Sequence, residues 1–243
     1  TPRRTRGQDQ KGTGSGRKMK PRIKLAESIT PNGACMALYE HDGAFSVSLN
    51  GKELMHSKVT ASERLLGRTG VDQLNKDIPT QVLIGGLGLG FTLKSVLESG
   101  NSKMKIELAE LVPEVIEWNR TYLKELNGVL LDDPCVDIKG MDVTDLIKNA
   151  EPRTYDAILL DVDNGPVAMV DANNEQLYSA SGIRLMCRAL KKGGRIAVWS
   201  ARPDLKFEKR LGKFCRKFQR VEAKVYDGAK RARHVLYILD PTS

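Results

Sequence analysis

A glycine-rich turn at residues 85–90 restricts the fold of this chain more than any other segment. The apolar run 81–86, QVLIGG, is typical of a strand buried on both faces, and the pattern of 91–99, FTLKSVLES, indicates a helix. Glycines at 86, 88 and 90, with Leu87 and Leu89 between them, let the main chain pass close beneath a ligand and direct the helix N-terminus towards it. A tight strand–helix connection without a ligand is the alternative.

The spacing within this turn excludes two common nucleotide-binding loops. The dinucleotide fingerprint G-x-G-x-x-G fails, because Phe91 stands three residues beyond Gly88. No Gly-Lys-Ser/Thr follows the turn, as a Walker loop requires. The sequence therefore disfavours NAD and a nucleoside triphosphate.

From residue 81 onwards, strand and helix patterns alternate. Five β–α units and a final pair of strands around Gly228 predict an α/β fold. We expect a doubly wound, mainly parallel Rossmann-like sheet with right-handed crossovers and a C-terminal antiparallel hairpin. Further strands are expected at 105–111, 135–140, 156–161, 194–200, 220–227 and 234–240, and helices at 113–126, 205–218 and one that ends within 188–194.

A small β-meander is expected before this domain. The strand patterns 34–40, 44–49 and 52–57 are separated by Asp42-Gly43 and Asn50-Gly51, dipeptides that accept positive φ in tight hairpin turns. A short helix at 60–67 follows, with Thr60 as its cap and Glu63 at the capping-box position. We expect a β-rich subdomain at 25–75 and the Rossmann-like domain at 76–243.

The net charge of +9 comes from the N-terminal tail. Residues 1–24 contain nine Lys or Arg and one acid, which leaves 30 basic and 29 acidic residues for the remainder. A disordered, solubilising tail is the favoured interpretation, because the segment has little apolar surface to bury. Nucleic-acid contact, through this tail alone, and an acid-poor targeting peptide are the alternatives.

The apolar runs and the cysteines indicate in which cellular compartment the protein is expected. No run reaches the ~18 apolar residues of a membrane span, so no membrane association is expected. The four cysteines, Cys35, Cys135, Cys187 and Cys215, lie far apart and form no CxxC pair. We therefore expect reduced, mostly buried thiols and a cytoplasmic protein.

Acidic residues follow several of the predicted strands. Because ligands of open α/β sheets bind beyond the carboxyl ends of the strands, these acids are candidate site residues. Glu110, after the second core strand, would accept both hydroxyls of a ribose; an acid that starts a helix is the alternative. Asp142 would accept an exocyclic adenine amine with Val143 against the ring, or would cap the next helix. Asp161 and Asp163 would orient and deprotonate an amine nucleophile, or would be surface acids of a turn.

Five segments in this order resemble the spermidine synthase family: VLIGGLGLG, AELVPEVIEWNR, GMDV, YDAILLDVDNGP and LYSASGIRLMCRALKKGG. The resemblance extends over about residues 35–240. It implies a methyltransferase-like Rossmann domain behind a small β-domain, a homodimer, and a ligand that is S-adenosylmethionine or its decarboxylated form. In that family Glu110, with Leu111 beside it, would hold the ribose, Asp142 and Val143 the adenine, and Asp161 would be the catalytic acceptor. Asp163 and Pro166 would line the same pocket.

The chain departs from the family at several positions. Leu89 stands where the family's G-G-G-D-G-G motif has the Asp that grips the aminopropyl amine, and Val162-Asp163-Asn164 replaces its S-S-D-P. His56-Ser57 lies near the family's Gln, and Ser62-Glu63-Arg64 stands where the family has Tyr-His-Glu. Weaker substrate-binding candidates are His56, Trp199 and Tyr178, for the last two of which core packing is the alternative.

Together these features predict a transferase that passes an alkyl group from the sulfonium ligand to a small amine-bearing substrate. Leu89 favours methyl transfer, and aminopropyl transfer is the alternative reaction. A degenerate binding or scaffold protein and an RNA-modifying enzyme that captures RNA through its tail are the rivals. The three histidines form no metal spacing with the cysteines, so no metal is expected.

Overall fold

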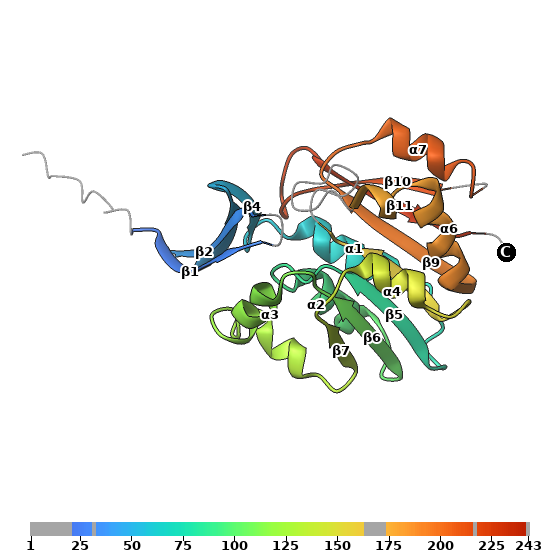
Figure 1. Ribbon diagram of the computed structural model, residues 1–243, viewed down its shortest axis with the longest axis horizontal. Coiled ribbons are helices and arrows are strands. Elements are labelled where there is room, and N and C mark those ends of the chain that lie inside the picture. The colour runs from blue at the N-terminus through green and yellow to red at the C-terminus, as the bar shows by residue number, and fades with distance from the viewer. Residues whose placement is uncertain (1–20, 31–32, 163–173, 216–217, 242–243) are drawn as a thin grey trace, which may run out of the picture.

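The structure, a computed structural model, describes residues 21–30, 33–162, 174–215 and 218–241. In these residues the chain forms a seven-stranded sheet, β10-β11-β9-β8-β5-β6-β7, and a separate four-stranded sheet, β1-β2-β3-β4 (Figure 1). The small sheet contains β1 (Ile23–Ile29), β2 (Cys35–His41), β3 (Ala44–Leu49) and β4 (Lys52–His56). The large sheet contains β5 (Thr80–Gly85), β6 (Met104–Ala109), β7 (Val136–Lys139), β8 (Tyr155–Leu160), β9 (Leu190–Ser200), β10 (Phe218–Ala223) and β11 (His234–Leu239).

The large sheet is mainly parallel, as predicted. β7, β6, β5, β8 and β9 pair in parallel, and β11 and β10 add antiparallel strands at one edge as the expected hairpin. Helices α1 (Ala61–Val71), α2 (Phe91–Ser99) and α3 (Pro113–Arg120) contribute to the core on one face, and α4 (Val143–Asn149), α6 (Ala180–Ala189) and α7 (Leu205–Leu211) to the core on the other. The remaining helical segments are α5 (Asn174–Leu177) and the 3₁₀ helix η1 (Gly128–Asp132).

Alternating side chains of β5 build these two cores. Val82 and Ile84 belong to one cluster and Leu83 to the other, and all three are fully buried, because successive side chains of a strand point to opposite faces. A strand covered on both faces is apolar throughout, which is the pattern seen in the sequence. The fold is therefore doubly wound.

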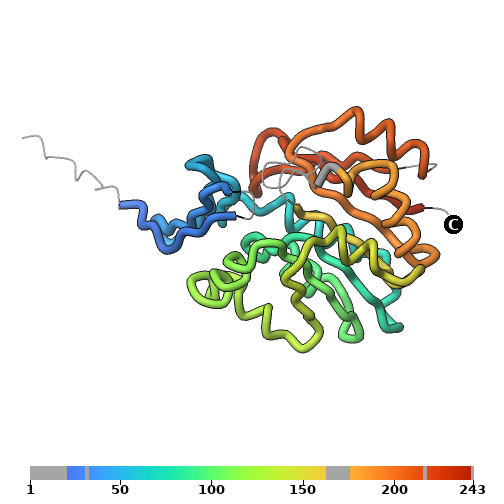
Figure 2. The backbone as a smooth tube through the Cα atoms, in the orientation of Figure 1, coloured from blue at the N-terminus to red at the C-terminus, as the bar shows by residue number. Residues whose placement is uncertain are grey.

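The small sheet is an antiparallel meander that packs against the large domain. Its two predicted turns are present: Asp42 and Asn50 have φ of 51° and 48°, each followed by a glycine that also has positive φ. Met36, Leu38, Val47 and Leu49 join the core cluster that contains α2 and β5. Figure 2 traces the chain from this sheet, in blue, through α1 into the large domain.

Several predicted boundaries were wrong. The first helix continues to Val71 rather than ending at residue 67, and the side chain of Thr60 makes no cap hydrogen bond. The helices predicted at 113–126 and 205–218 end at Arg120 and Leu211. The helix predicted to end within 188–194 does end there, at Ala189, but the strand predicted from residue 194 begins earlier, at Leu190, so the lysines and glycines belong to β9.

Tertiary contacts explain these differences. Beyond α3 the chain turns back so that Asn127 reaches the glycine loop, which a continuous helix would prevent. The lysines and glycines before residue 195 resemble a helix stop, yet Leu190 pairs with Tyr155 and extends β9 through an irregular register. β1 was not anticipated, and it pairs with β2 although Ile29 is 61% exposed. None of the helices in the described ranges is long and apolar enough to cross a membrane.

Candidate functional site

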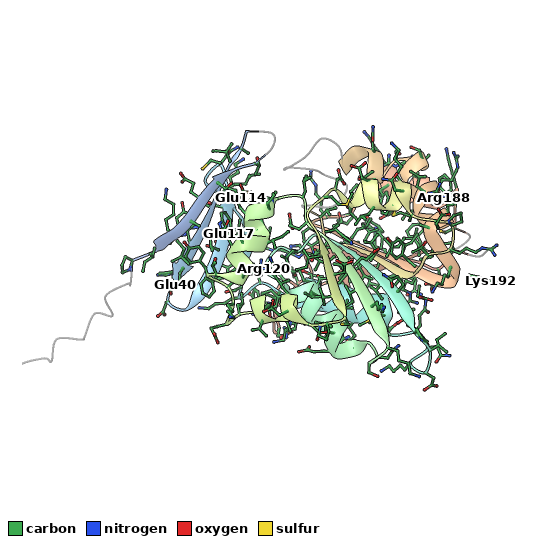
Figure 3. All side chains as sticks on the ribbon, turned by 60° about the horizontal axis from the view of Figure 1, so that its bottom comes forward. Glu40, Glu114, Glu117, Arg120, Arg188 and Lys192 are labelled. Carbon is green, nitrogen blue, oxygen red and sulfur yellow. The ribbon has the colours of Figure 1, made fainter. Side chains whose placement is uncertain are left out.

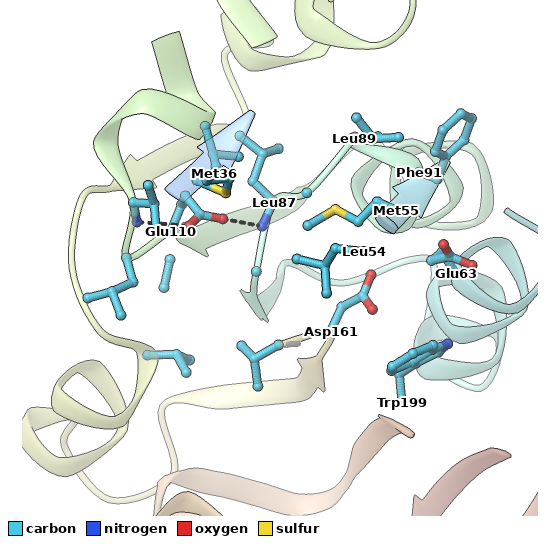
Figure 4. A pocket seen from close by; sticks show the side chains of 18 of the residues that line it. Met36, Leu54, Met55, Glu63, Leu87, Leu89, Phe91, Glu110, Asp161 and Trp199 are labelled. Atoms are coloured by element: carbon cyan, nitrogen blue, oxygen red, sulfur yellow. Dashed lines mark hydrogen bonds between the residues drawn. The ribbon is translucent and has the colours of Figure 1, made fainter. Parts of the chain in front are cut away.

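A cavity of about 260 Å³ lies where β5, β6 and β8 end. Its floor is the glycine loop after β5, and residues of β2 and β4 in the small sheet close it from the other side. Figure 4 shows Glu110 beside the loop at one end and Glu63, Asp161 and Trp199 towards the other. The cavity therefore occupies the position in which open α/β sheets bind ligands.

The glycine loop needs glycine for reasons of space as well as backbone conformation. Gly86 has φ of 93°, and a Cβ at this position would lie 2.2 Å from the carbonyl oxygen of Asp161. Gly88, with φ of 51°, faces the sulfur of Met55 across the cavity. Gly86, Leu87 and Gly88 line the cavity as expected. Gly90 instead begins α2 with φ of 80° and packs against Asn127, so it is not among the described lining residues.

Two buried asparagines hold the loop from behind. The Asn119 amide donates to the carbonyl oxygen of Gly88 at 2.9 Å, and the Asn127 amide donates to that of Leu89 at 2.8 Å. Three loop amides have partners of their own. The Gly86 amide donates to the Ala109 carbonyl, the Gly90 amide to the Leu87 carbonyl, and the Leu87 amide to Glu110.

The carboxylate of Glu110 links the glycine loop to the turn after β6. Oε2 accepts from the Leu87 amide and Oε1 from the Val112 amide, each at 2.9 Å. Burial raises the pKa of Glu110, and the backbone hydrogen bonds oppose this effect. The amides of Gly88 and Leu111 also interact with this carboxylate. Leu111 and Val112 continue the cavity wall beside it.

Asp142 and Val143 follow β7 and form another part of the wall. Asp142 caps α4, because its Oδ1 accepts from the Thr144 amide at 2.7 Å. The capping alternative is therefore present in the structure, and Oδ2 forms no hydrogen bond with the described part of the chain. Val143 is buried against Gly85.

Asp161 follows β8 and is positioned by contacts on two sides. Its amide donates to the Gly85 carbonyl at 2.8 Å, and its Oδ2 accepts from the Thr92 hydroxyl at 2.5 Å. Thr92 lies in the first turn of α2, so one helix holds both the loop and the acid. Asp163 and Pro166 lie outside the described residues.

The weaker candidates divide between cavity and core. His56 lines the cavity, and its Nδ1 accepts from the Lys58 amide at 3.1 Å. Trp199 also lines it, with its ring 4.8 Å from that of His234 in an edge-on arrangement. Tyr178 is buried in the core on the opposite face of the sheet, edge-on to Phe207, and is not among the described lining residues. Core packing, the alternative to substrate binding, is therefore what the structure shows for Tyr178.

Sequence reasoning missed three residues at this end of the cavity. Glu63 and His234 line it, and the Ser62 hydroxyl joins them through hydrogen bonds of 2.6 Å to Glu63 Oε2 and 2.8 Å to His234 Nδ1. Burial raises the pKa of Glu63 and lowers that of His234, to which Arg233 adds a smaller lowering. The sequence contained one signal, the departure at 62–64, but nothing local placed it beside Asp161.

The charge of the described lining is one-sided. It includes the acids Glu53, Glu63, Glu110, Asp142 and Asp161, and no lysine or arginine. Within the described ranges no group of three or more His, Cys, Asp or Glu side chains is arranged to hold a metal ion. The described lining thus favours a cationic ligand over an anionic one.

Residues 67–227 match the family model of the spermine/spermidine synthase domain. The chain belongs to the spermine/spermidine synthase family. Curated relatives include the polyamine aminopropyltransferase of Mycobacterium tuberculosis, 30% identical over 50% of this chain and 23% of the relative. Polyamine aminopropyltransferase 1 of Hyperthermus butylicus is 32% identical over 48% of this chain and 39% of the relative. The match therefore spans less than half the length of these relatives.

Solved structures of spermidine synthases share the fold. One, in complex with the transition state analogue AdoDATO, has a TM-score of 0.74 at 20% identity and covers 90% of this chain and 74% of that one. The spermidine synthase of Thermotoga maritima has a TM-score of 0.70 at 19% identity, with 90% and 73% covered. These likenesses confirm the predicted fold class for this family member.

Proposed function

We propose that this protein transfers an aminopropyl group from decarboxylated S-adenosylmethionine to a small amine. The observation that carries the proposal is the acidic lining of the cavity, which has no lysine or arginine among its described residues. Both reactants are cations, and carboxylates in a desolvated cavity favour cations strongly. The curated relatives with this activity support the same assignment.

The nucleoside part of the donor fits the end of the cavity that contains Glu110. The carboxylate of this residue would accept the ribose hydroxyls beside the backbone amides that it already binds. Asp142 Oδ2 would accept the exocyclic adenine amine, and Val143 and Leu111 would contact the ring. Gly86 and Gly88 line the cavity, so the backbone of the loop would lie directly beside the ligand.

The decarboxylated donor fits the charge better than S-adenosylmethionine does. The additional carboxylate of S-adenosylmethionine would enter a cavity that already contains carboxylates and would repel them. Methyl transfer from S-adenosylmethionine is the second candidate, favoured by one observation: Leu89, which lines the cavity, offers no counter-ion to the amine of the decarboxylated donor. We favour the decarboxylated donor, because several acids line the cavity and Leu89 is a single position.

Asp161 has the geometry of the residue that assists the nucleophile. As the acceptor nitrogen forms its bond to the propyl carbon, the carbon–sulfur bond breaks and its electron pair stays on sulfur, which leaves as a neutral thioether. The nitrogen then carries an extra proton, which Asp161 would accept. The hydrogen bond from Thr92 holds this carboxylate at the loop, so that alignment, the main source of rate in such a displacement, is supplied by α2 and β8.

The first prediction concerns Asp161→Asn. The wild type, given decarboxylated S-adenosylmethionine and a short aliphatic diamine, should release methylthioadenosine and an aminopropylated amine, measured by chromatography and mass spectrometry. Asp161→Asn should lower the turnover at least about 100-fold, because it loses the proton acceptor. Its affinity for methylthioadenosine should stay near that of the wild type. A methylated amine formed from S-adenosylmethionine would support the second candidate instead, and no product from either donor would contradict the transferase assignment.

We also infer the compartment, the oligomeric state and the domain division of this protein. Free cysteines at positions 35, 135, 187 and 215 are typical of a reducing compartment, which supports a cytoplasmic enzyme. The family resemblance supports a homodimer and the division into a tail at 1–24, a β-rich subdomain at 25–75 and the ligand-binding domain at 76–243. Contact with nucleic acid, if present, would rest on the basic tail alone.

A further inference from the structure

Glu63 points into the cavity from the first turn of α1. Figure 4 shows its carboxylate on the same side of the cavity as that of Asp161, next to Trp199. The Thr92 hydroxyl confirms that the two residues are close, since it lies 2.5 Å from Asp161 Oδ2 and 3.4 Å from the Glu63 carbonyl oxygen. Glu63 thus belongs to the part of the cavity in which an alkyl group would be transferred.

A hydrogen-bonded chain sets the orientation of this carboxylate. Ser62 is fully buried, and its single hydroxyl proton is donated to Glu63 Oε2. His234 Nδ1 must then donate to the Ser62 oxygen, because that oxygen has no second proton to offer. One oxygen of Glu63 is therefore fixed by Ser62, and the carboxylate also interacts with its own backbone amide.

The carboxylate forms no ion pair with the described side chains, and the positive charge of Arg64 opposes the effect of burial on its pKa only weakly. Arg64, its neighbour in sequence, is exposed and forms its ion pair with Asp227. The surroundings of Glu63 in the cavity include Met55, Phe91 and Trp199, none of which can neutralise an acid. Burial raises the pKa of Glu63 accordingly. A desolvated carboxylate that faces a cavity without a counter-ion is arranged to receive one from a ligand.

Leu89 makes such a cation site necessary. The aminopropyl donor ends in an ammonium group, and the resemblance to spermidine synthases places the carboxylate for this group at position 89. Here that side chain is an apolar one, 5% exposed, within the hydrophobic core cluster. Leu89 of the glycine loop, Met55 and Phe91 are apolar residues that line the side of the cavity on which Glu63 lies (Figure 4). Methylene groups can lie along such a wall and bring the ammonium to the acid at its end.

We propose that Glu63 binds the ammonium group of the alkyl donor and takes the place of the carboxylate missing at position 89. This inference rests on the proposed aminopropyl transfer and names the residue that recognises its donor. Ser62 and His234 are positioning residues, since they hold Glu63 Oε2.

Glu63→Gln tests this assignment, because the amide keeps the size of the side chain and an oxygen for Ser62. Calorimetry should be run with three probes: methylthioadenosine, the dimethylsulfonium analogue of the same nucleoside, and decarboxylated S-adenosylmethionine. Only decarboxylated S-adenosylmethionine has the aliphatic amine of the aminopropyl chain. The affinity of the variant for this probe alone should therefore fall, by about 10-fold or more, as expected for a lost charge-assisted contact. Glu98→Gln, an exposed acid on α2, is the matched control and should change none of the three affinities.

Two further measurements separate the possible failures. Glu63→Asp retains the charge and should keep part of the preference for the amine-bearing probe, which a merely structural role of Glu63 would not predict. Equal losses for all three probes, or no loss for any, would overturn the role of Glu63. Wild-type protein that binds the amine-bearing probe more tightly than the dimethylsulfonium analogue but forms no aminopropylated product would contradict the proposed function and leave the Glu63 site intact.

Discussion

At the scale of single residues, Glu110 combines two tasks in one side chain. Its oxygens hold the amides of Leu87 and Val112, and the same oxygens face the cavity. Glu110→Gln would replace one acceptor with an NH₂ group that points at a backbone N–H. The substitution therefore disturbs the loop and removes a ligand contact at once.

We predict that Glu110→Gln weakens the binding of methylthioadenosine by about 1.5–3 kcal/mol, the scale of hydrogen bonds to charged groups. Titration calorimetry measures this loss. The control is Glu117→Gln, an exposed acid on α3 (Figure 3), which should leave the affinity unchanged. Unaltered affinity in a folded Glu110→Gln protein would contradict the assignment of the ribose to Glu110.

At the scale of secondary-structure elements, the connection between β5 and α2 serves both the packing of the fold and the lining of the cavity. The strand ends against β8, and the Asp161 carbonyl fills the space that a side chain at Gly86 would need. Any Cβ there would push the loop away from Asp161. The glycine thus keeps a candidate catalytic acid next to the ligand-binding loop.

Gly86→Ala should therefore destabilise the protein by about 2–5 kcal/mol, because overpacking adds to the cost of a left-handed backbone. Gly228→Ala is the matched control: its φ of 85° is similar, but nothing lies within 4 Å of a Cβ at that position. Gly228→Ala should lower the free energy of unfolding by about 1–2 kcal/mol, because only the left-handed backbone conformation disfavours the alanine. Urea unfolding measures both, and equal losses would show that the contact with Asp161 is unimportant.

The elements could be predicted where the local pattern and the tertiary environment agree. The buried run of β5, the turns at Asp42 and Asn50, and the strand-end acids Glu110, Asp142 and Asp161 all satisfied this condition. The start of β9 could not be predicted, because Leu190 pairs with β8 although the following lysines and glycines signal a helix stop. Pairing across the sheet outweighed a local preference.

Glu63 was missed for a related reason. Its spacing from Thr60 matches a capping box, which accounts for an acid at this position without a ligand. Only the packing of α1 brings Glu63 to His234, which is far away in sequence and begins β11. Contacts of this kind depend on the whole sheet and leave no local pattern.

At the scale of the whole molecule, Arg195 joins three parts of the chain. From β9 it donates to the Thr69 carbonyl and to Asp72 and Gln73 at the end of α1, and to Asp240 after β11. The arginine side chain is 9% exposed, whereas those of Asp72 and Asp240 are 52% and 45% exposed. The cluster fastens the C-terminal end of α1 to the sheet.

Arg195→Met should lower the free energy of unfolding by about 1–3 kcal/mol at neutral pH, a modest range because the acids are partly solvated. The hydrogen bond from Arg195 lowers the pKa of Asp240 below that of an unfolded aspartate. This contribution is therefore fully present above the ordinary aspartate pKa and is lost as the pH falls through the lowered value. Urea unfolding should show the two proteins converging at acidic pH, whereas Lys192→Met, an exposed control on the same strand, should match the wild type throughout. A pH-independent difference would contradict the ionic explanation.

The two ends of α1 have different partners. Its first turn presents Glu63 to the cavity, and its last turn is held by Arg195 at Thr69, about 9 Å further along the helix axis. A substitution at Asp72 or Gln73 would remove one of the contacts that hold this end, although neither residue is among the described lining of the cavity. The position of Glu63 is thus tied to side chains at the opposite end of α1, outside the described lining of the cavity.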